Sequence, residues 1–211
     1  ITILKIMSRK ERNKAILRRF PDIKLSYNKN INRKVYADFY QIIPKGQKAF
    51  MWFTYVHKKN VCMVLRLDYK GNVKDVRTYS ACFNNALSYG SVFYGTVLNI
   101  ADNKNKKNIF CIEDVYYYKG KDVHSVSQKN KLELYSELFE RELKQVEYSS
   151  EFIFPVLAYM NTNYDSIQKS IETLPYSIYG IKYIRNKYPV GIEKVVVSVK
   201  KEAIFRVSAR L

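Results

Sequence analysis

The feature that most constrains the fold of this chain is a hairpin-like stretch near its middle. It runs from Phe93 to Val123 and reads FYGTVLNIADNKNKKNIFCIEDVYYYKGKDV. Two runs rich in β-branched and aromatic residues, Ser91–Ile100 and Ile109–Tyr118, flank a polar loop of Asn and Lys. This pattern predicts two antiparallel strands joined by a loop longer than the tightest turns use. We expect the rest of the chain to be organised around this pair.

Two acidic residues, Glu113 and Asp114, interrupt the second of these apolar runs. A carboxylate in a buried strand costs free energy unless it has a partner, so the pair needs an explanation. Two interpretations remain open. The acids either belong to a functional site, or they lie on a solvated face or in a structural salt bridge to Lys119 or Lys121.

The composition is that of a folded domain with an anionic partner. A length of 211 residues with 47% apolar and 15% aromatic residues excludes disorder for most of the chain. The 37 Lys and Arg residues outnumber the 19 Asp and Glu residues, for a net charge of +18. This charge favours RNA, DNA, a phosphorylated ligand or an acidic protein surface, although ribosomal and virion packing proteins share the bias. The abundance of Lys, Asn, Ile and Tyr indicates an AT-rich genome, and we expect a viral source.

The sequence also argues against several classes of protein. Three separated cysteines (Cys62, Cys82 and Cys111) and two histidines (His57 and His124) predict no zinc site, and the thiols are expected to be free in a reducing compartment. No apolar run approaches the roughly 18–20 residues that span a membrane. The first residues are too charged for a signal peptide, and the absence of an initiating Met is expected for a fragment. We expect a cytoplasmic location, in the host cytoplasm or a viral factory, with no membrane partner.

The order of the expected elements predicts an α+β fold of antiparallel β-sheets with a few flanking helices. Residues 1–34 are expected to form a basic N-terminal segment, with a short helix over 5–20 and a loop over 22–34, and residues 35–211 a single domain. The other expected strands are Val35–Ile43, Lys48–Val56, Asn60–Asp68, Val73–Phe83, Phe152–Met160, Tyr179–Ile184, Val195–Val199 and Ala203–Val207. Helices are expected over 125–147, with Ser125 or Ser127 as N-cap, and over Asp165–Leu174, with Asp165 as cap.

Five segments together resemble a known family. They are IPKGQKAFMWF (43–53), FYGTVL (93–98), FCIEDVYYYKGKDV (110–123), LPYSIYGIKYI (174–184) and IFRVSARL (204–211). Their order and spacing resemble the nucleotidyltransferase fold of mRNA capping enzymes and ATP-dependent ligases. The chain looks most like a catalytically silent relative, the cap-binding domain of snurportin. The resemblance covers roughly Phe39 to Leu211.

The departures from that family decide between an enzyme and a binding module. The family's nucleophile motif is Lys-x-Asp-Gly-x-Arg, in which the lysine amine attacks the phosphate. With Gly46 on the motif's glycine, Ile43 takes the nucleophile position, Lys45 that of the Asp and Lys48 that of the Arg. The segment around Tyr179 also lacks the family's Glu before Gly. We therefore expect no enzyme activity; the alternative is a guanylyltransferase or ligase that recruits Lys45 or Lys48.

The remaining features suit recognition of a methylated cap. An N7-methylated guanine is cationic and binds best between aromatic faces, with a carboxylate at its Watson–Crick edge. The resemblance implies stacking by Phe205 and Phe39, phosphate contact by Lys48 and Arg206, and contact of Glu113 with the guanine edge. The strand pattern adds further candidate aromatics, each of which could instead pack in the core: Trp52, Phe93, Tyr94, Tyr116 and Tyr118.

The expected function is thus a non-catalytic mRNA cap-binding module that uses no cofactor and no metal. Its expected partners are capped mRNA or the cap nucleotide, the RNA phosphate backbone, and viral translation-initiation or transcription proteins. The other open alternative is a structural docking domain of a viral polymerase or capsid assembly.

Overall fold

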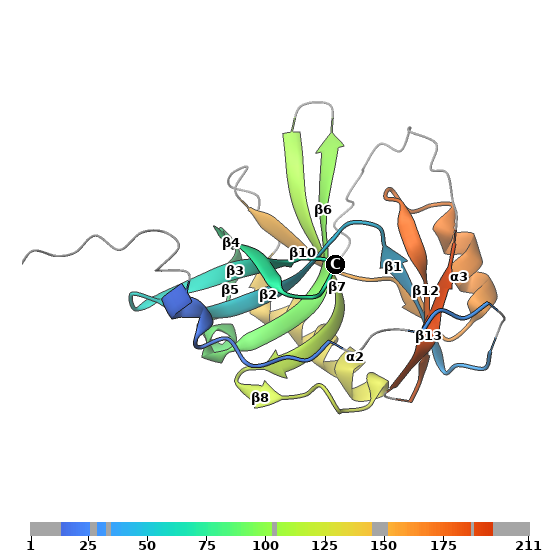
Figure 1. The fold of residues 1–211 in the computed structure, drawn as a ribbon, viewed down its shortest axis with the longest axis horizontal. Coiled ribbons are helices and arrows are strands. Elements are labelled where there is room, and N and C mark those ends of the chain that lie inside the picture. The colour runs from blue at the N-terminus through green and yellow to red at the C-terminus, as the bar shows by residue number, and fades with distance from the viewer. Residues whose placement is uncertain are drawn as a thin grey trace, which may run out of the picture.

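The computed structural model describes residues 14–25, 29–32, 35–102, 105–144, 152–186 and 188–195. Over these residues the fold is α+β, with mostly antiparallel sheets and few helices, which confirms the predicted class (Figure 1). Two of the sheets, one larger and one smaller, position the residues discussed below.

The large sheet has the strand order β10-β7-β6-β2-β3-β4, with β8 pairing outside this path to β7. Strand β10 runs parallel to β7, and the other neighbours are antiparallel. The strands span Gln47–Val56 (β2), Lys59–Leu67 (β3), Val73–Tyr79 (β4), Ser91–Asp102 (β6), Asn105–Tyr118 (β7), Lys121–Asp122 (β8) and Ile153–Leu157 (β10).

The predicted central hairpin is present as β6 and β7, but it is longer than expected. Pairing continues through the polar stretch to Asp102 and Asn105, so only residues 103 and 104 separate the strands. Strand pairing satisfies backbone N–H and C=O groups whatever the side chains are, so the polar composition did not end the strands. The far end of the pair projects from the rest of the sheet (Figure 1).

The small sheet has the order β11-β1-β12-β13 and is packed on one helix. Its elements span Phe39–Pro44 (β1), Met160–Asn161 (β11), Ile178–Arg185 (β12) and Tyr188–Lys194 (β13), and helix α3 spans Tyr164–Ile171. Strand β13 was not expected, because Pro189 and Gly191 obscure its pattern. Proline is tolerated there because β13 is an edge strand. The strand expected at Val195 is not formed at that residue, and the rest of it, with the strand expected over 203–207, lies outside the described residues.

The long predicted helix is shorter and ends differently. Helix α2 spans Gln128–Glu137 and continues as a π-helical turn, η2, over Leu138–Glu142. Strand β9 (Leu143–Lys144) follows and pairs with β5 (Cys82–Phe83). The N-cap is Ser127, one of the two expected caps, whose Oγ accepts from the Asn130 N–H. Helix α3 is capped by Asn163 rather than by Asp165, which lies in its first turn.

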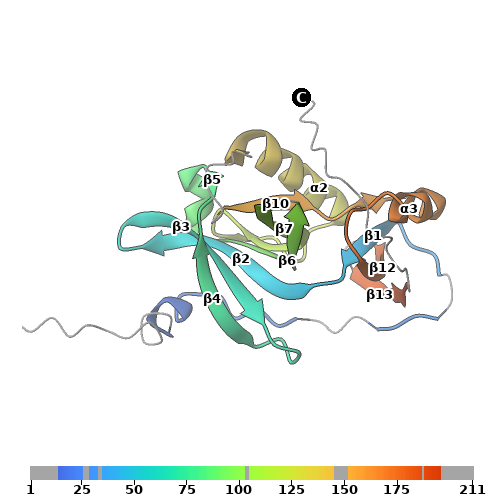
Figure 2. The same cartoon turned by 90° about the horizontal axis from the view of Figure 1, so that it is seen from above.

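The two faces of the large sheet are covered by different parts of the chain. Alternate residues of β2 point to opposite faces, so Met51 and Phe53 join the main core, which α2 and η2 also line. On the other face, Phe50 and Trp52 pack under residues 14–25, which begin with a helical turn over 14–17. Figure 2 shows α2 on one side of the sheet and residues 14–25 on the other. This part of the basic segment therefore packs against the large sheet.

Candidate functional site

The candidate site is a polar cluster on three neighbouring strands of the large sheet. Lys48 of β2 lies directly opposite Thr96 of β6, and Glu113 belongs to the next strand, β7. The Lys48 Nζ donates to Glu113 Oε1 at 2.6 Å and to Thr96 Oγ1 at 2.7 Å. The Thr96 hydroxyl in turn donates to the same Glu113 oxygen. Two residues that the sequence placed at separate points of one site, Lys48 and Glu113, are thus in direct contact.

Burial differs sharply between the two partners. The Glu113 side chain is 4% exposed, whereas the Lys48 side chain is 30% exposed. A carboxylate this deeply buried needs compensating donors, and Lys48 and Thr96 supply them. The ammonium can still meet a ligand from solvent, because nearly a third of the Lys48 side chain remains exposed.

The salt bridges expected from sequence proximity are not the ones that form. Glu113 pairs with Lys48, and Asp114 pairs with Lys131 of α2 at 2.6 Å. Lys119 pairs instead with Glu137 and Glu142, at 2.6 and 2.8 Å. Of the interpretations left open by the sequence, a bridge from the two acids to Lys119 or Lys121 is therefore not the one that forms. Successive strand residues point to opposite faces, so the two acids meet different lysines, both distant in the sequence.

Tyr94 and Gln41 border the cluster. The Lys48 Nζ lies 6.0 Å from the centroid of the Tyr94 ring, within the range of a cation–π contact. Burial and the nearby Glu113 raise the pKa of Tyr94, so its phenol is neutral at physiological pH. Gln41 Nε2 donates to the Glu113 carbonyl at 3.1 Å. Because Gln41 belongs to β1 of the small sheet, the cluster lies where the two sheets adjoin.

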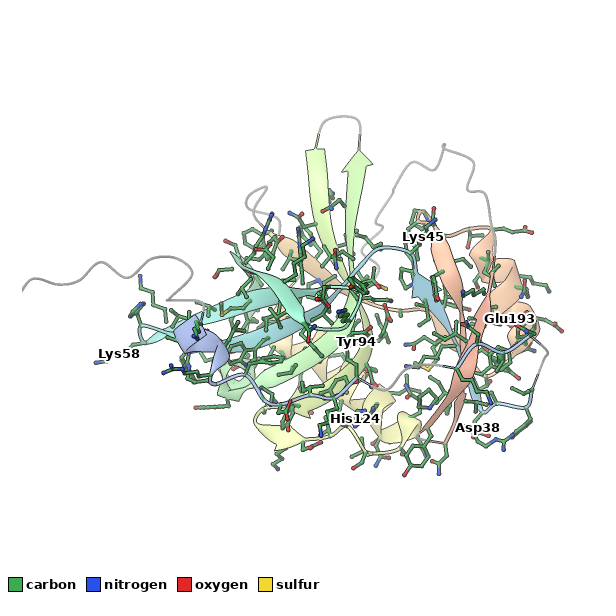
Figure 3. All side chains as sticks on the ribbon, in the orientation of Figure 1. Asp38, Lys45, Lys58, Tyr94, His124 and Glu193 are labelled. Carbon is green, nitrogen blue, oxygen red and sulfur yellow. The ribbon has the colours of Figure 1, made fainter. Side chains whose placement is uncertain are left out.

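Gln41 and the turn that contains Gly46 form the immediate surroundings of the cluster. The Oε1 atom of Gln41 is buried and has no hydrogen-bond partner in the described part of the chain. The turn from β1 to β2 passes close to the cluster, since a Cβ on Gly46 would lie 2.6 Å from Thr96 Cγ2 and 2.9 Å from the Val97 carbonyl oxygen. Only glycine allows this approach. Figure 3 shows Tyr94 near the middle of the large sheet, with Lys45 of this turn above it and His124 below.

The other aromatic candidates are distributed over both faces of the sheet. Trp52 and Tyr116 lie on the face that carries Lys48, but each is at most 6% exposed. Tyr116 stacks on His124 with ring centroids 4.4 Å apart. Phe93 and Tyr118 lie in the main core on the opposite face. The structure therefore brings Tyr94, but not these four rings, beside Lys48.

The remaining candidates lie apart from the cluster or cannot be placed. Phe39 is half-buried at the start of β1, where it pairs with Ile184. Phe205 and Arg206 lie outside the described residues. Sequence reasoning missed Thr96 and Gln41. Gln41 had a readable signal, since it interrupts the apolar run of FYQIIP. Thr96 had none, because threonine is an ordinary strand residue.

The thiol of Cys111, which lies near the cluster, is not activated. All three cysteines are free, and burial raises the pKa of the neighbouring Cys111 to about 12, so its thiol is uncharged at neutral pH. Within the described ranges, no group of three His, Cys, Asp or Glu residues could hold a metal ion.

No helix among the described residues is both long and apolar enough to cross a bilayer.

The chain matches no protein-family model, and no curated protein matches its sequence.

Proposed function

We propose that this chain is a non-catalytic module that binds the 5′ cap of mRNA, with Lys48, Glu113 and Tyr94 at the centre of its site. The observation that carries the proposal is the contact between a partly exposed lysine and a buried carboxylate, beside an aromatic ring, where two sheets adjoin. This two-sheet arrangement also supports the finer proposal that the fold is of the nucleotidyltransferase type.

In this proposal Lys48 contacts the cap phosphates. An ammonium has three N–H donors, and Glu113 and Thr96 take two of them. The third is available to a phosphate oxygen, with which a charged donor makes a strong hydrogen bond. Glu113 and Thr96 fix the position of the ammonium before the ligand arrives, which lowers the entropy lost on binding.

The base is held by Tyr94 and Glu113. The neutral Tyr94 ring offers a π-face to a cationic methylated guanine, as it already does to the Lys48 ammonium. For Glu113 to contact the guanine edge, the base must reach beneath Lys48, because the carboxylate is almost fully covered. We retain Phe205 and Arg206 as the second stacking ring and second phosphate contact.

Two features support binding without covalent catalysis. Ile43, at the family's nucleophile position, is an aliphatic residue that is 2% exposed. The Lys48 ammonium is engaged by two acceptors, whereas an attacking lysine must present a free lone pair to phosphorus. A guanylyltransferase would leave an acid-stable nucleotidyl-lysine after incubation with GTP, and we expect no such adduct. Its detection would replace this proposal with the enzyme alternative.

Calorimetric titration with 7-methyl-GTP tests the site. Lys48→Ala should weaken binding by about 1.5–3 kcal/mol, the typical contribution of a hydrogen bond to a charged group, and the loss should shrink with added salt. Lys70→Ala is the matched control, because Lys70 is an exposed lysine of the β3–β4 turn that also lies over a tyrosine ring. Equal affinities for the two variants would remove Lys48 from the site.

A further inference from the structure

A pocket lies on the same face of the large sheet as the polar cluster, further along β2. Its volume is about 380 Å³, and its lining includes Arg19, Trp52, Tyr55, Ser88, Tyr89 and Tyr117. Trp52 is four residues from Lys48 on one strand, which places it roughly 13 Å away at the rise of a β-strand. The pocket is therefore separate from the polar cluster but close enough for one extended ligand to reach both.

Aromatic rings form much of the pocket, and one of them is available to a ligand. Tyr89 is 66% exposed, and its ring meets that of Tyr55 edge-on with centroids 6.1 Å apart. Such an exposed ring is a platform on which a planar base can stack, whatever the identity of the base. Trp52 lies deeper, with the Arg19 guanidinium 5.9 Å from its ring centroid.

Arg19 and Ser88 are polar residues of the pocket lining. The Arg19 Nη2 donates to the Tyr55 carbonyl at 2.5 Å, which fixes the guanidinium and leaves further N–H donors for a phosphate. Ser88 is 2% exposed, and its hydroxyl has no hydrogen-bond partner among the described residues. An unsatisfied buried hydroxyl is costly, and a ligand edge that bonds to it removes the penalty.

We propose that this pocket binds a nucleobase of single-stranded RNA. The base stacks on Tyr89, its polar edge bonds to the Ser88 hydroxyl, and a backbone phosphate contacts Arg19. The net charge of +18 favours such an anionic ligand over a neutral peptide. The inference deepens the proposed function, since the base would belong to the RNA that follows the cap, and it rests on that function only for this assignment.

The test uses a short, fluorescein-labelled, uncapped oligoadenylate and measures its affinity by anisotropy. Tyr89→Ala should weaken binding roughly 5- to 150-fold, the range for loss of one stacked base. The matched control is Tyr69→Ala, because Tyr69 is also a largely exposed tyrosine, at 90%, but does not belong to the pocket lining. The control should bind like the wild type. If Tyr89→Ala binds as tightly as Tyr69→Ala, the inference is overturned.

Two further measurements separate this pocket from a general basic surface and from the cap site. Ser88→Ala removes a hydroxyl that has no partner, so it should weaken oligoadenylate binding without lowering thermal stability; unchanged affinity would exclude contact with the hydroxyl. Titration with 7-methyl-GTP should be unaffected by Tyr89→Ala. If the wild type binds 7-methyl-GTP but Tyr89→Ala leaves the affinity for oligoadenylate unchanged, the pocket proposal alone is excluded. If Tyr89→Ala weakens oligoadenylate binding but the wild type does not bind 7-methyl-GTP, the cap proposal alone is excluded.

Discussion

The adjacent acids Glu113 and Asp114 form two lysine–carboxylate pairs of similar length that differ in the burial of the lysine. Each carboxylate is bound by one lysine at 2.6 Å, but Lys48 is 30% exposed and Lys131 only 3%. In the first pair the carboxylate is buried and the ammonium is open to a ligand. In the second pair the ammonium is buried beneath α2. Exposure of the cation, rather than the length of the contact, separates a candidate binding site from a structural bridge.

The largest expected effect follows from removing each acid by an isosteric change. Asp114→Asn leaves the Lys131 ammonium buried without its counter-ion and should lower the free energy of unfolding by about 3–5 kcal/mol. Glu113→Gln should cost only about 1 kcal/mol, because Lys48 can turn to solvent and the amide oxygen can still accept from Thr96. Urea denaturation measures both. Equal losses would mean that the exposure of the lysine does not distinguish the pairs.

The same Glu113→Gln variant should affect ligand binding more than folding. It removes the charge that fixes Lys48 and the acceptor proposed for the guanine edge, so the affinity for 7-methyl-GTP should fall by about 1.5–3 kcal/mol. Calorimetry on the folded variant measures this loss, with Glu137→Gln as a control acid outside the site. A folded Glu113→Gln protein with wild-type affinity would make the Lys48–Glu113 pair structural, like its neighbour.

The smallest effect is expected at the most exposed of these acids, Glu137, whose side chain is 37% exposed. The hydrogen bond from Lys119 lowers the pKa of Glu137 from its ordinary value of 4.5. A lowered pKa in the folded state contributes stability above the unfolded value, and this contribution is lost as the pH falls through the folded value. Glu137→Gln should therefore cost at most about 1 kcal/mol at neutral pH, because solvent screens the pair.

Urea titrations of the Glu137→Gln variant and the wild type at several pH values measure this difference. The two proteins should converge as the pH falls below the ordinary carboxyl range. A difference that stays constant down to acid pH would show that Glu137 contributes by packing rather than by charge.

Much of the fold was predictable, because strand alternation is a local signal. The central hairpin and the antiparallel strands around it follow from runs such as Ser91–Ile100, and confirmation of the α+β class rests on them. Strand β13 was not predicted, because Pro189 and Gly191 break the apolar pattern that marks a strand. The π-helical turn that follows α2 was not predicted, because its apolar residues continue the spacing of the α-helix.

The candidate site was predictable only in part. Lys48 and Glu113 could be selected from the sequence, but their direct contact depends on the register of β2, β6 and β7. Alternation shows which residues share a face, not which face is covered. Trp52 and Phe50 look available on the strand, yet Phe20 packs on both rings with centroids 5.3 Å apart. Such long-range packing is absent from any local pattern.

The most direct measurement of the central proposal is titration of the wild-type chain with 7-methyl-GTP and, in parallel, with unmethylated GTP. The triphosphates are identical, so only the cationic base differs, and Tyr94 should favour the methylated ligand through its π-face. We predict tighter binding of 7-methyl-GTP, with a preference that persists at high salt because stacking is less screened than phosphate contact. Equal affinities, or no binding of either nucleotide, would contradict cap recognition at Lys48, Glu113 and Tyr94.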